Sequence, residues 1–183
     1  EVFEGSTDIY FGGEAALMYG VNAPTGFIGG SVGNSSGTVY TFDGDVTITF
    51  AGNAGIGSSV YGASRYAQVT HTGDVYITVS DNVYCSQPLY AAGNCATFNG
   101  NTKVVLNGGE LEKNIFGGSS TGTMNGDAEI VINGGRFVYN GSATSASNIP
   151  DYGTSNVYGG GASKSTLNGN ASVLMNGGEI FGD

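Results

Sequence analysis

Apolar and polar residues alternate in short segments that recur along this chain. In the first of them, residues 46–50, Val46, Ile48 and Phe50 share one parity and two threonines occupy the other. The same alternation returns at residues 75–79, 102–106, 128–132 and 171–175. A period of two with β-branched residues on one side is typical of half-buried strands, and no stretch shows helical periodicity longer than two turns. These segments are therefore predicted to be β-strands.

Each predicted strand belongs to a longer phrase that repeats. The phrase opens with glycine followed by Asp or Asn, and its last three copies close with Asn-Gly-Gly. Its copies begin at Gly44, Gly73, Gly100, Gly126 and Gly169. A second phrase, exemplified by residues 115–118, alternates with it, and both recur at intervals that give a basic unit of about 26 residues. Such a period indicates one supersecondary unit stacked on itself, with glycines at tight turns.

Residues of successive copies align by type. Asn107, Asn133 and Asn176 hold the same position, and we expect them to form a structural ladder of amides about 4.8 Å apart that hydrogen-bond along the stack. Parallel in-register stacking favours such identity, whereas the reversing strands of a β-meander do not need it. We therefore predict an all-β fold, a single-stranded parallel β-helix (β-solenoid) of about five coils.

Three segments depart from the repeat. Residues 1–26 fit it poorly and are predicted to form an irregular first coil or an N-terminal cap before the β-helix repeats of residues 27–183. Residues 139–155 lengthen one unit and are predicted to be a loop insertion at a coil corner. The chain stops at residues 178–183, partway through a coil, which predicts a fragment of a longer solenoid or a subunit whose end meets another molecule.

The composition narrows the class of protein. The 183 residues include 34 glycines without a collagen period and are 39% hydrophobic, so one domain with a sizeable core is expected. A net charge of −10 disfavours nucleic acids and anionic membranes as partners, and the lack of an apolar run of about 18 residues predicts no membrane insertion. A start at Glu1 without a signal peptide fits a processed segment. Low lysine content with an Asn-, Thr- and Ser-rich texture predicts a secreted or cell-surface protein.

The cysteines leave two alternatives open. Cys85 and Cys95 lie ten residues apart in a local segment that allows a disulfide bond, and two free thiols are the alternative. Zinc is not expected, because His71 is the only histidine. His71 lies between threonines and is expected to be exposed. No cofactor is expected.

The charged residues offer little for catalysis. Lys103 and Glu129 share one column of the aligned repeats, which predicts a ladder ion pair. Three more charged residues share the column after Asn-Gly-Gly: Glu110, Arg136 and Glu179. Alternating sign up a column indicates mutual neutralisation, and a catalytic base within this trio is the alternative. The chain is therefore expected not to be an enzyme.

Aspartates after glycine raise the question of a metal. Asp45, Asp74 and Asp127 share a column with Asn101 and Asn170, and Asp or Asn after glycine is typical of turn residues. The functional alternative is weak calcium binding by Asp43, Asp45 and Asp74, because hard cations need several oxygen ligands.

An aromatic column is the first candidate binding surface. It comprises Tyr61, Tyr90, Phe116 and Tyr158. Neighbouring strand residues face opposite sides, so the adjacent aliphatic column is expected to point inward and the aromatic rings outward, beside a smooth strip of glycines. Rings along a flat groove can stack on sugars. Covering of the rings by loops is the alternative.

A second candidate surface is the outward apolar column Val105, Val131 and Leu174, which could be covered by a neighbour. The same column continues as Thr49 and Thr78. Flat threonine arrays order water, but two threonines are too few, so ice binding is a remote option.

The alternation of Asn-Gly-Gly-x-[Leu/Phe/Ile] with [Ile/Val]-[Phe/Tyr]-Gly-Gly-[Ser/Gly] resembles the repeat regions of adhesin-like surface proteins of bacteria and methanogenic archaea, over residues 27–183. Those regions are similar to the pectin-lyase-like right-handed parallel β-helix superfamily. The resemblance implies a right-handed coil and a stalk that recognises host, mucin or plant glycans. The acidic catalytic clusters of the enzymatic members find no matching positions here.

We thus expect a non-catalytic extracellular or cell-surface β-solenoid, acting as an adhesin stalk or as a module that binds a glycan or a host-surface protein. Two alternatives remain open: a polysaccharide-active lyase or hydrolase, and a structural subunit that self-associates end to end or laterally.

Overall fold

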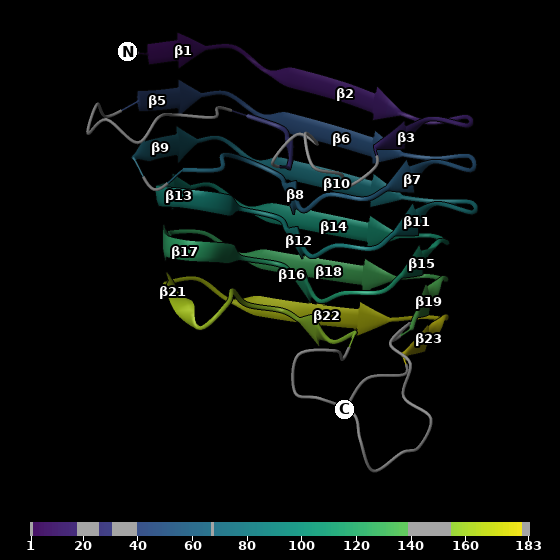
Figure 1. Ribbon diagram of the computed structural model, residues 1–183. Helices are drawn as coiled ribbons and strands as arrows, with labels where there is room; N and C mark the ends of the chain where they lie inside the picture. Colours follow the sequence, from purple (N-terminus) through teal and green to yellow (C-terminus); the bar gives the residue numbers. More distant parts are fainter. Residues whose placement is uncertain (1, 18–25, 31–39, 67, 139–154, 181–183) are drawn as a thin grey trace.

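The computed structural model describes residues 2–17, 26–30, 40–66, 68–138 and 155–180, and the secondary structure of these residues consists of β-strands. Figure 1 shows the strands as rungs stacked one above another, with the N-terminal strands at one end and the C-terminal strands at the other. The prediction of an all-β chain is confirmed. Within the described ranges no helix has the length and apolarity needed to cross a bilayer.

The strands form four parallel sheets. Sheet A contains β1 (Val2–Glu4), β5 (Tyr40–Asp43), β9 (Val69–Thr72), β13 (Gly93–Asn99), β17 (Ser119–Met124) and β21 (Lys164–Leu167). Sheet B contains β2 (Thr7–Phe11), β6 (Val46–Phe50), β10 (Val75–Val79), β14 (Thr102–Leu106), β18 (Ala128–Ile132) and β22 (Ala171–Met175).

The other two sheets are built from two-residue strands. Sheet C contains β3 (Ala16–Leu17), β7 (Gly55–Ile56), β11 (Tyr84–Cys85), β15 (Glu110–Leu111), β19 (Arg136–Phe137) and β23 (Glu179–Ile180). Sheet D contains β4 (Phe27–Ile28), β8 (Val60–Tyr61), β12 (Leu89–Tyr90), β16 (Ile115–Phe116) and β20 (Val157–Tyr158).

Consecutive strands of the chain enter the four sheets in turn, and each strand pairs with the equivalent strands of the repeats before and after it. In sheet B, for example, Ile77 of β10 is in register with Ile48 of β6 and with Val104 of β14. The pairing partners are the residues that align in the sequence repeat. This stacked parallel arrangement is that of a solenoid and is compatible with a β-helix.

Strands also form before residue 27. β1, β2 and β3 pair in parallel with β5, β6 and β7, so the described part of residues 1–26 continues sheets A, B and C. Of the predicted loop insertion, residues 139–154 lie outside the described residues. Its last residue, Ser155, is buried, and its hydroxyl donates a hydrogen bond of 2.8 Å to the carbonyl oxygen of Val138.

The core lies between the sheets and follows the alternation of the strands. Ile48, Ile77, Val104 and Ile130 form one fully buried column of sheet B. Burial of each such side chain contributes about 1.5–3 kcal/mol of transfer free energy. At the last strand of the sheet, β22, the equivalent Val173 is 45% exposed. Each repeat thus covers the core residues of its neighbour.

Glycine at the start of the first phrase is required by the distance between repeats. A Cβ atom added to Gly126 would lie 1.9 Å from the carbonyl oxygen of Gly100, and one added to Gly100 would lie 2.0 Å from that of Gly73. A backbone oxygen cannot move aside without disturbing the neighbouring repeat. The recurring glycine therefore fixes how closely successive repeats approach.

Candidate functional site

The aromatic column of sheet D forms a continuous stack. The ring centroids are 5.6 Å apart for Tyr61–Tyr90, 5.0 Å for Tyr90–Phe116 and 4.8 Å for Phe116–Tyr158, with interplanar angles of 16° or less. Each ring therefore covers the face of the next and presents mainly its edge to the outside. Tyr158, at the last described rung of this sheet, is 41% exposed. The column is thus built to stabilise the stack, and it offers few ring faces to a sugar.

The glycines beside these rings do not form the expected smooth surface strip. Gly62 and Gly117 are buried, and an added Cβ atom would meet the carbonyl oxygen of Ala91 at 2.0 Å or of Gly159 at 2.3 Å. They permit close approach of repeats, as the glycines of the first phrase do.

The outward apolar column of sheet B lies where the alternation places it. Val105 and Val131 are in register and half-buried, and Leu174 of β22 is 53% exposed. Thr78 precedes Val105 in the same column.

Within each polar column, side chains of successive repeats contact one another. The Nδ2 atom of Asn133 donates to Oδ1 of Asn107 at 2.9 Å, and the Nδ2 atom of Asn176 donates to Oδ1 of Asn133 at 2.9 Å. Lys103 Nζ lies 2.8 Å from a Glu129 carboxylate oxygen, which forms the predicted ladder ion pair. Such exposed pairs are worth under about 1 kcal/mol each.

The calcium hypothesis on Asp43, Asp45 and Asp74 is not supported. Among the residues that the structure describes, no group of three acidic, histidine or cysteine side chains is arranged to hold a metal ion. Asp45 instead accepts a hydrogen bond of 2.8 Å from the backbone N–H of Asp74, and Asp74 accepts one of 2.7 Å from the backbone N–H of Asn101. Backbone ladder bonds therefore occupy oxygens that a cation would need.

The cysteines are free and buried, so the disulfide alternative is wrong for this structure. Cys85 lies in β11 of sheet C and Cys95 in β13 of sheet A, and each sulfur points to a nearby carbonyl oxygen instead of to the other sulfur. Burial raises the pKa of both thiols to about 11. They act as small core residues and not as nucleophiles.

His71 is also buried, which contradicts the expectation that it is exposed. Its ring stacks between Phe42 and Phe98, with centroid distances of 4.9 and 5.0 Å. The threonines beside it face outward, so the histidine of this strand is the residue that points into the core. Burial lowers the pKa of His71 from 6.5 to about 4, against the opposing influence of Asp45, the Gly73 backbone and Asp43.

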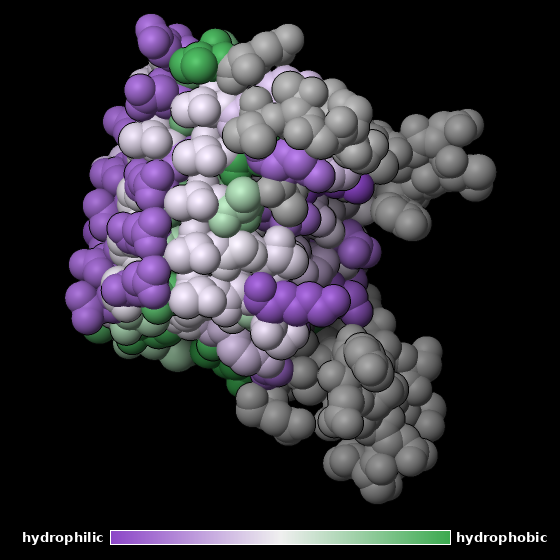
Figure 2. All heavy atoms as spheres, turned by 90° about the vertical axis from the view of Figure 1, so that its left-hand side faces the viewer, coloured by the Kyte–Doolittle hydropathy of each residue, from purple (hydrophilic) through white to green (hydrophobic). Residues whose placement is uncertain are grey.

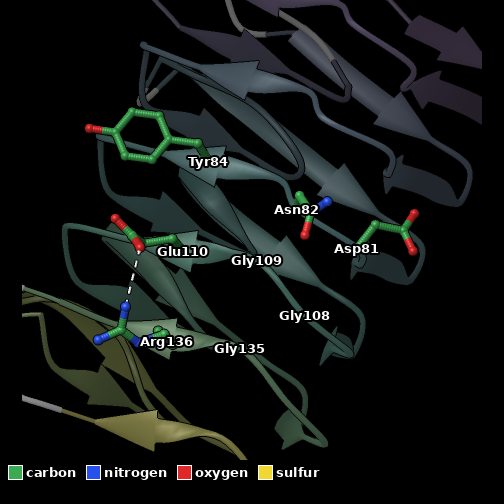
Figure 3. A pocket seen from close by; sticks show the side chains of 8 residues that line it. All are labelled: Asp81, Asn82, Tyr84, Gly108, Gly109, Glu110, Gly135 and Arg136. Atoms are coloured by element: carbon green, nitrogen blue, oxygen red, sulfur yellow. Dashed lines mark ion pairs between the residues drawn. The ribbon is translucent and has the colours of Figure 1, made fainter.

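A hollow of about 490 Å³ on sheet C is lined by aromatic, acidic, amide and basic side chains, a wider range of groups than any of the columns above (Figure 3). Tyr84, Glu110 and Arg136 begin β11, β15 and β19 and form one column in register. Arg136 pairs with Glu110 at 3.7 Å and with Glu179 at 3.1 Å. We call this the sheet C hollow. The remaining lining residues are Asp81, Asn82, Gly108, Gly109 and Gly135.

The Asn-Gly-Gly turns make this hollow possible. Gly108, Gly109 and Gly135 carry no side chains, so space opens between the column of Tyr84, Glu110 and Arg136 and the turn before β11 (Figure 3). That turn supplies Asp81 and Asn82 from the opposite side. The hollow thus follows from the repeat itself.

Asp81 has an unusual backbone. Its φ of 58° lies in the left-handed region, where the preceding repeat has Gly52 with φ 68°. A side chain at such a position is uncommon, although Asp and Asn tolerate it best. One carboxylate oxygen of Asp81 accepts a hydrogen bond of 2.9 Å from the Gly52 N–H, so the side chain is fixed at the rim.

Chemically, the sheet C hollow combines an aromatic ring, carboxylates, an amide and a guanidinium. Tyr84 is 39% exposed, so part of its ring is open to solvent. Hydroxyl groups of a sugar both donate and accept hydrogen bonds, and its C–H face packs on aromatic rings. A second hollow of about 450 Å³ on sheet B has a related lining that includes Tyr76, Lys103 and Glu129.

Sequence reasoning placed Glu110 and Arg136 in one column but missed Tyr84, Asp81 and Asn82. These three residues belong to a copy that lacks the closing Asn-Gly-Gly, so the column after Asn-Gly-Gly did not extend to them. The signal that could have found them is the replacement of Asn-Gly-Gly by Ser80-Asp81-Asn82 in this repeat.

No family model matches the chain, and neither a curated protein nor a solved structure matches it.

Proposed function

We propose that this chain is a non-catalytic, extracellular or cell-surface β-solenoid that binds neutral glycans through the sheet C hollow. We further propose that the stack is a right-handed parallel β-helix of five to six coils. The four sheets entered in turn by the chain and the resemblance of its repeats to adhesin-like surface proteins support this architecture.

One observation carries the glycan proposal: a partly exposed tyrosine in register with a Glu–Arg pair, over a floor of glycines. The ring supplies a stacking face, and the charged and amide groups supply hydrogen bonds in both directions. An open hollow along successive repeats suits an extended chain passing over it.

Charge favours a neutral glycan over a polyuronate. Asp81 and Glu110 place two carboxylates around the hollow against the single guanidinium of Arg136. The whole chain carries a net charge of −10, so a polyanion such as pectate would be repelled.

The test is binding to a panel of neutral and uronate-containing polysaccharides, followed by calorimetry with the best oligosaccharide. Tyr84→Ala is expected to weaken binding about tenfold or more, which corresponds to about 1.4 kcal/mol. Tyr10→Ala, which removes a tyrosine that is 71% exposed outside the hollow, is the matched control. Equal affinities of Tyr84→Ala and the parent chain would contradict the site.

The same samples test the enzymatic alternative. Incubation of the chain with the polysaccharides is expected to release neither unsaturated products nor new reducing ends. Turnover that is lost in Arg136→Gln would replace the binding proposal with a lyase or hydrolase at this hollow.

A further inference from the structure

Five threonines form one column on the outward side of sheet A. The strand pairing puts them in register one repeat apart: Thr41, Thr70, Thr97, Thr123 and Thr166. The residues that follow them point the other way, since Phe42, Phe98 and Met124 are fully or almost fully buried. The threonine side chains therefore face solvent. We call this column and its neighbour, defined next, the threonine face.

A second column runs beside the first, two residues further along each strand. It consists of Asp43, Thr72, Asn99, Asn125 and Asn168. The Nδ2 atom of Asn125 donates to Asn99 Oδ1 at 2.9 Å, and the Nδ2 atom of Asn168 donates to Asn125 Oδ1 at 2.8 Å. Figure 2 looks onto this side and shows a straight column of near-neutral hydropathy beside a hydrophilic column.

The two columns form a regular grid. Strands of one sheet are about 4.8 Å apart, and two residues along a strand span about 6.6 Å. Threonine is branched at Cβ and has a restricted χ1 angle, so repeated threonines on equivalent backbones hold their methyl and hydroxyl groups alike. The amide ladder fixes the asparagines of the second column. The grid is thus ordered before any partner arrives.

We propose that the threonine face binds the surface of ice. Its hydroxyls can hold water molecules at a repeat close to the short oxygen repeat of hexagonal ice, while the methyl groups between them exclude other positions. The partner is a neutral, periodic lattice, and the threonine column itself carries no charge although the chain carries −10.

Other occupants fit less well. A second copy of this chain has the same net charge of −10, and repulsion between two chains of like charge opposes pairing. A glycan would lack a stacking ring, because neither column contains an aromatic residue. The threonine face is separate from the sheet C hollow, so this proposal does not rest on the glycan proposal.

The experiment measures thermal hysteresis and inhibition of ice recrystallisation by the folded chain. The chain is expected to show both, and Thr97→Tyr, in the middle of the column, is expected to abolish them. Thr78→Tyr places the same ring on the outward side of sheet B and is expected to retain activity. Tyr84→Ala, which alters the sheet C hollow, is expected to retain it as well.

Circular dichroism and thermal unfolding check that each variant folds. Thr166→Tyr is the second variant, because this position is exposed and a larger ring meets little packing there. Three results would overturn the proposal: an inactive parent chain, full activity in a folded Thr97→Tyr or Thr166→Tyr variant, or an equal loss in Thr78→Tyr. A parent chain that forms dimers which Thr97→Tyr dissociates, without activity on ice, would also overturn it in favour of a protein partner.

Discussion

Acidification should destabilise this fold by a contribution that can be assigned to one buried side chain, His71. Its imidazole is fully buried between Phe42 and Phe98, and neither ring nitrogen has a hydrogen-bond partner of ordinary geometry among the described residues. Protonation would place a positive charge between two aromatic rings in the core. The desolvation cost of that charge is what lowers the pKa.

The size of the effect follows from proton linkage. In the unfolded chain His71 titrates near 6.5, whereas in the folded chain burial lowers the pKa to about 4. Between these values the unfolded state binds the proton and the folded state does not, so the free energy of unfolding decreases as the pH falls. The contribution is complete above pH 6.5, and its loss reaches about 3 kcal/mol near pH 4.

The assay compares the parent chain with His71→Phe in urea unfolding at several pH values from 7.5 to 4, followed by circular dichroism. Both proteins share the titration of their carboxylates, so only the difference between them reports His71. The variant is expected to be at least as stable at pH 7.5, because it replaces unpaired buried nitrogens by an apolar ring, and to gain about 3 kcal/mol relative to the parent by pH 4.

NMR supplies an independent check, because His71 is the only histidine and its ring protons cannot be confused with others. Their chemical shifts should stay constant from pH 7.5 to about 5. Parallel pH profiles of the two proteins, or a titration of His71 near 6.5, would refute the argument that burial governs this residue.

Two further predictions concern the stack itself. Gly126→Ala places a Cβ atom against the carbonyl oxygen of Gly100 in the preceding repeat and is expected to cost about 1–3 kcal/mol or more in urea unfolding. Gly160→Ala, where the nearest atom to the new Cβ is 3.9 Å away, is the control and should change stability little. Cys85 and Cys95, with pKa values raised to about 11 by burial, should resist alkylation at pH 8 in the folded chain and react fully in urea, which mass spectrometry can count. Fast alkylation of the folded chain, or a mass that shows a disulfide, would contradict their burial as free thiols.

The repeat made much of this fold predictable. Where the sequence period equals the structural period, aligned residues become neighbours, so the asparagine ladder and the Lys103–Glu129 pair could be placed from alignment alone. The register in sheet B follows the same rule, and a slip by one residue would turn the apolar side chains outward.

Residues outside the aligned phrases were not predictable in the same way. The threonine face lies just before the first phrase, where Thr-x-Asx precedes the opening glycine in four of the five repeats. The threonines on either side of His71 suggest an exposed position, whereas its column partners Phe42 and Phe98 show that the position is internal. Tyr84 begins β11 shortly after a turn whose residues differ from copy to copy. The outward direction of the aromatic column was foreseeable, but the stacking of each ring on the next depends on side-chain rotamers.

The parallel pairing of every sheet has a mechanical consequence. Backbone hydrogen bonds in sheets A to D run from one repeat to the next, along the direction in which the repeats are stacked. A pulling force in that direction would stretch these bonds lengthwise, a few at a time, instead of shearing a whole sheet at once. The solenoid is therefore expected to unfold one repeat at a time from an end, and each step should lengthen the molecule by the extended length of one repeat.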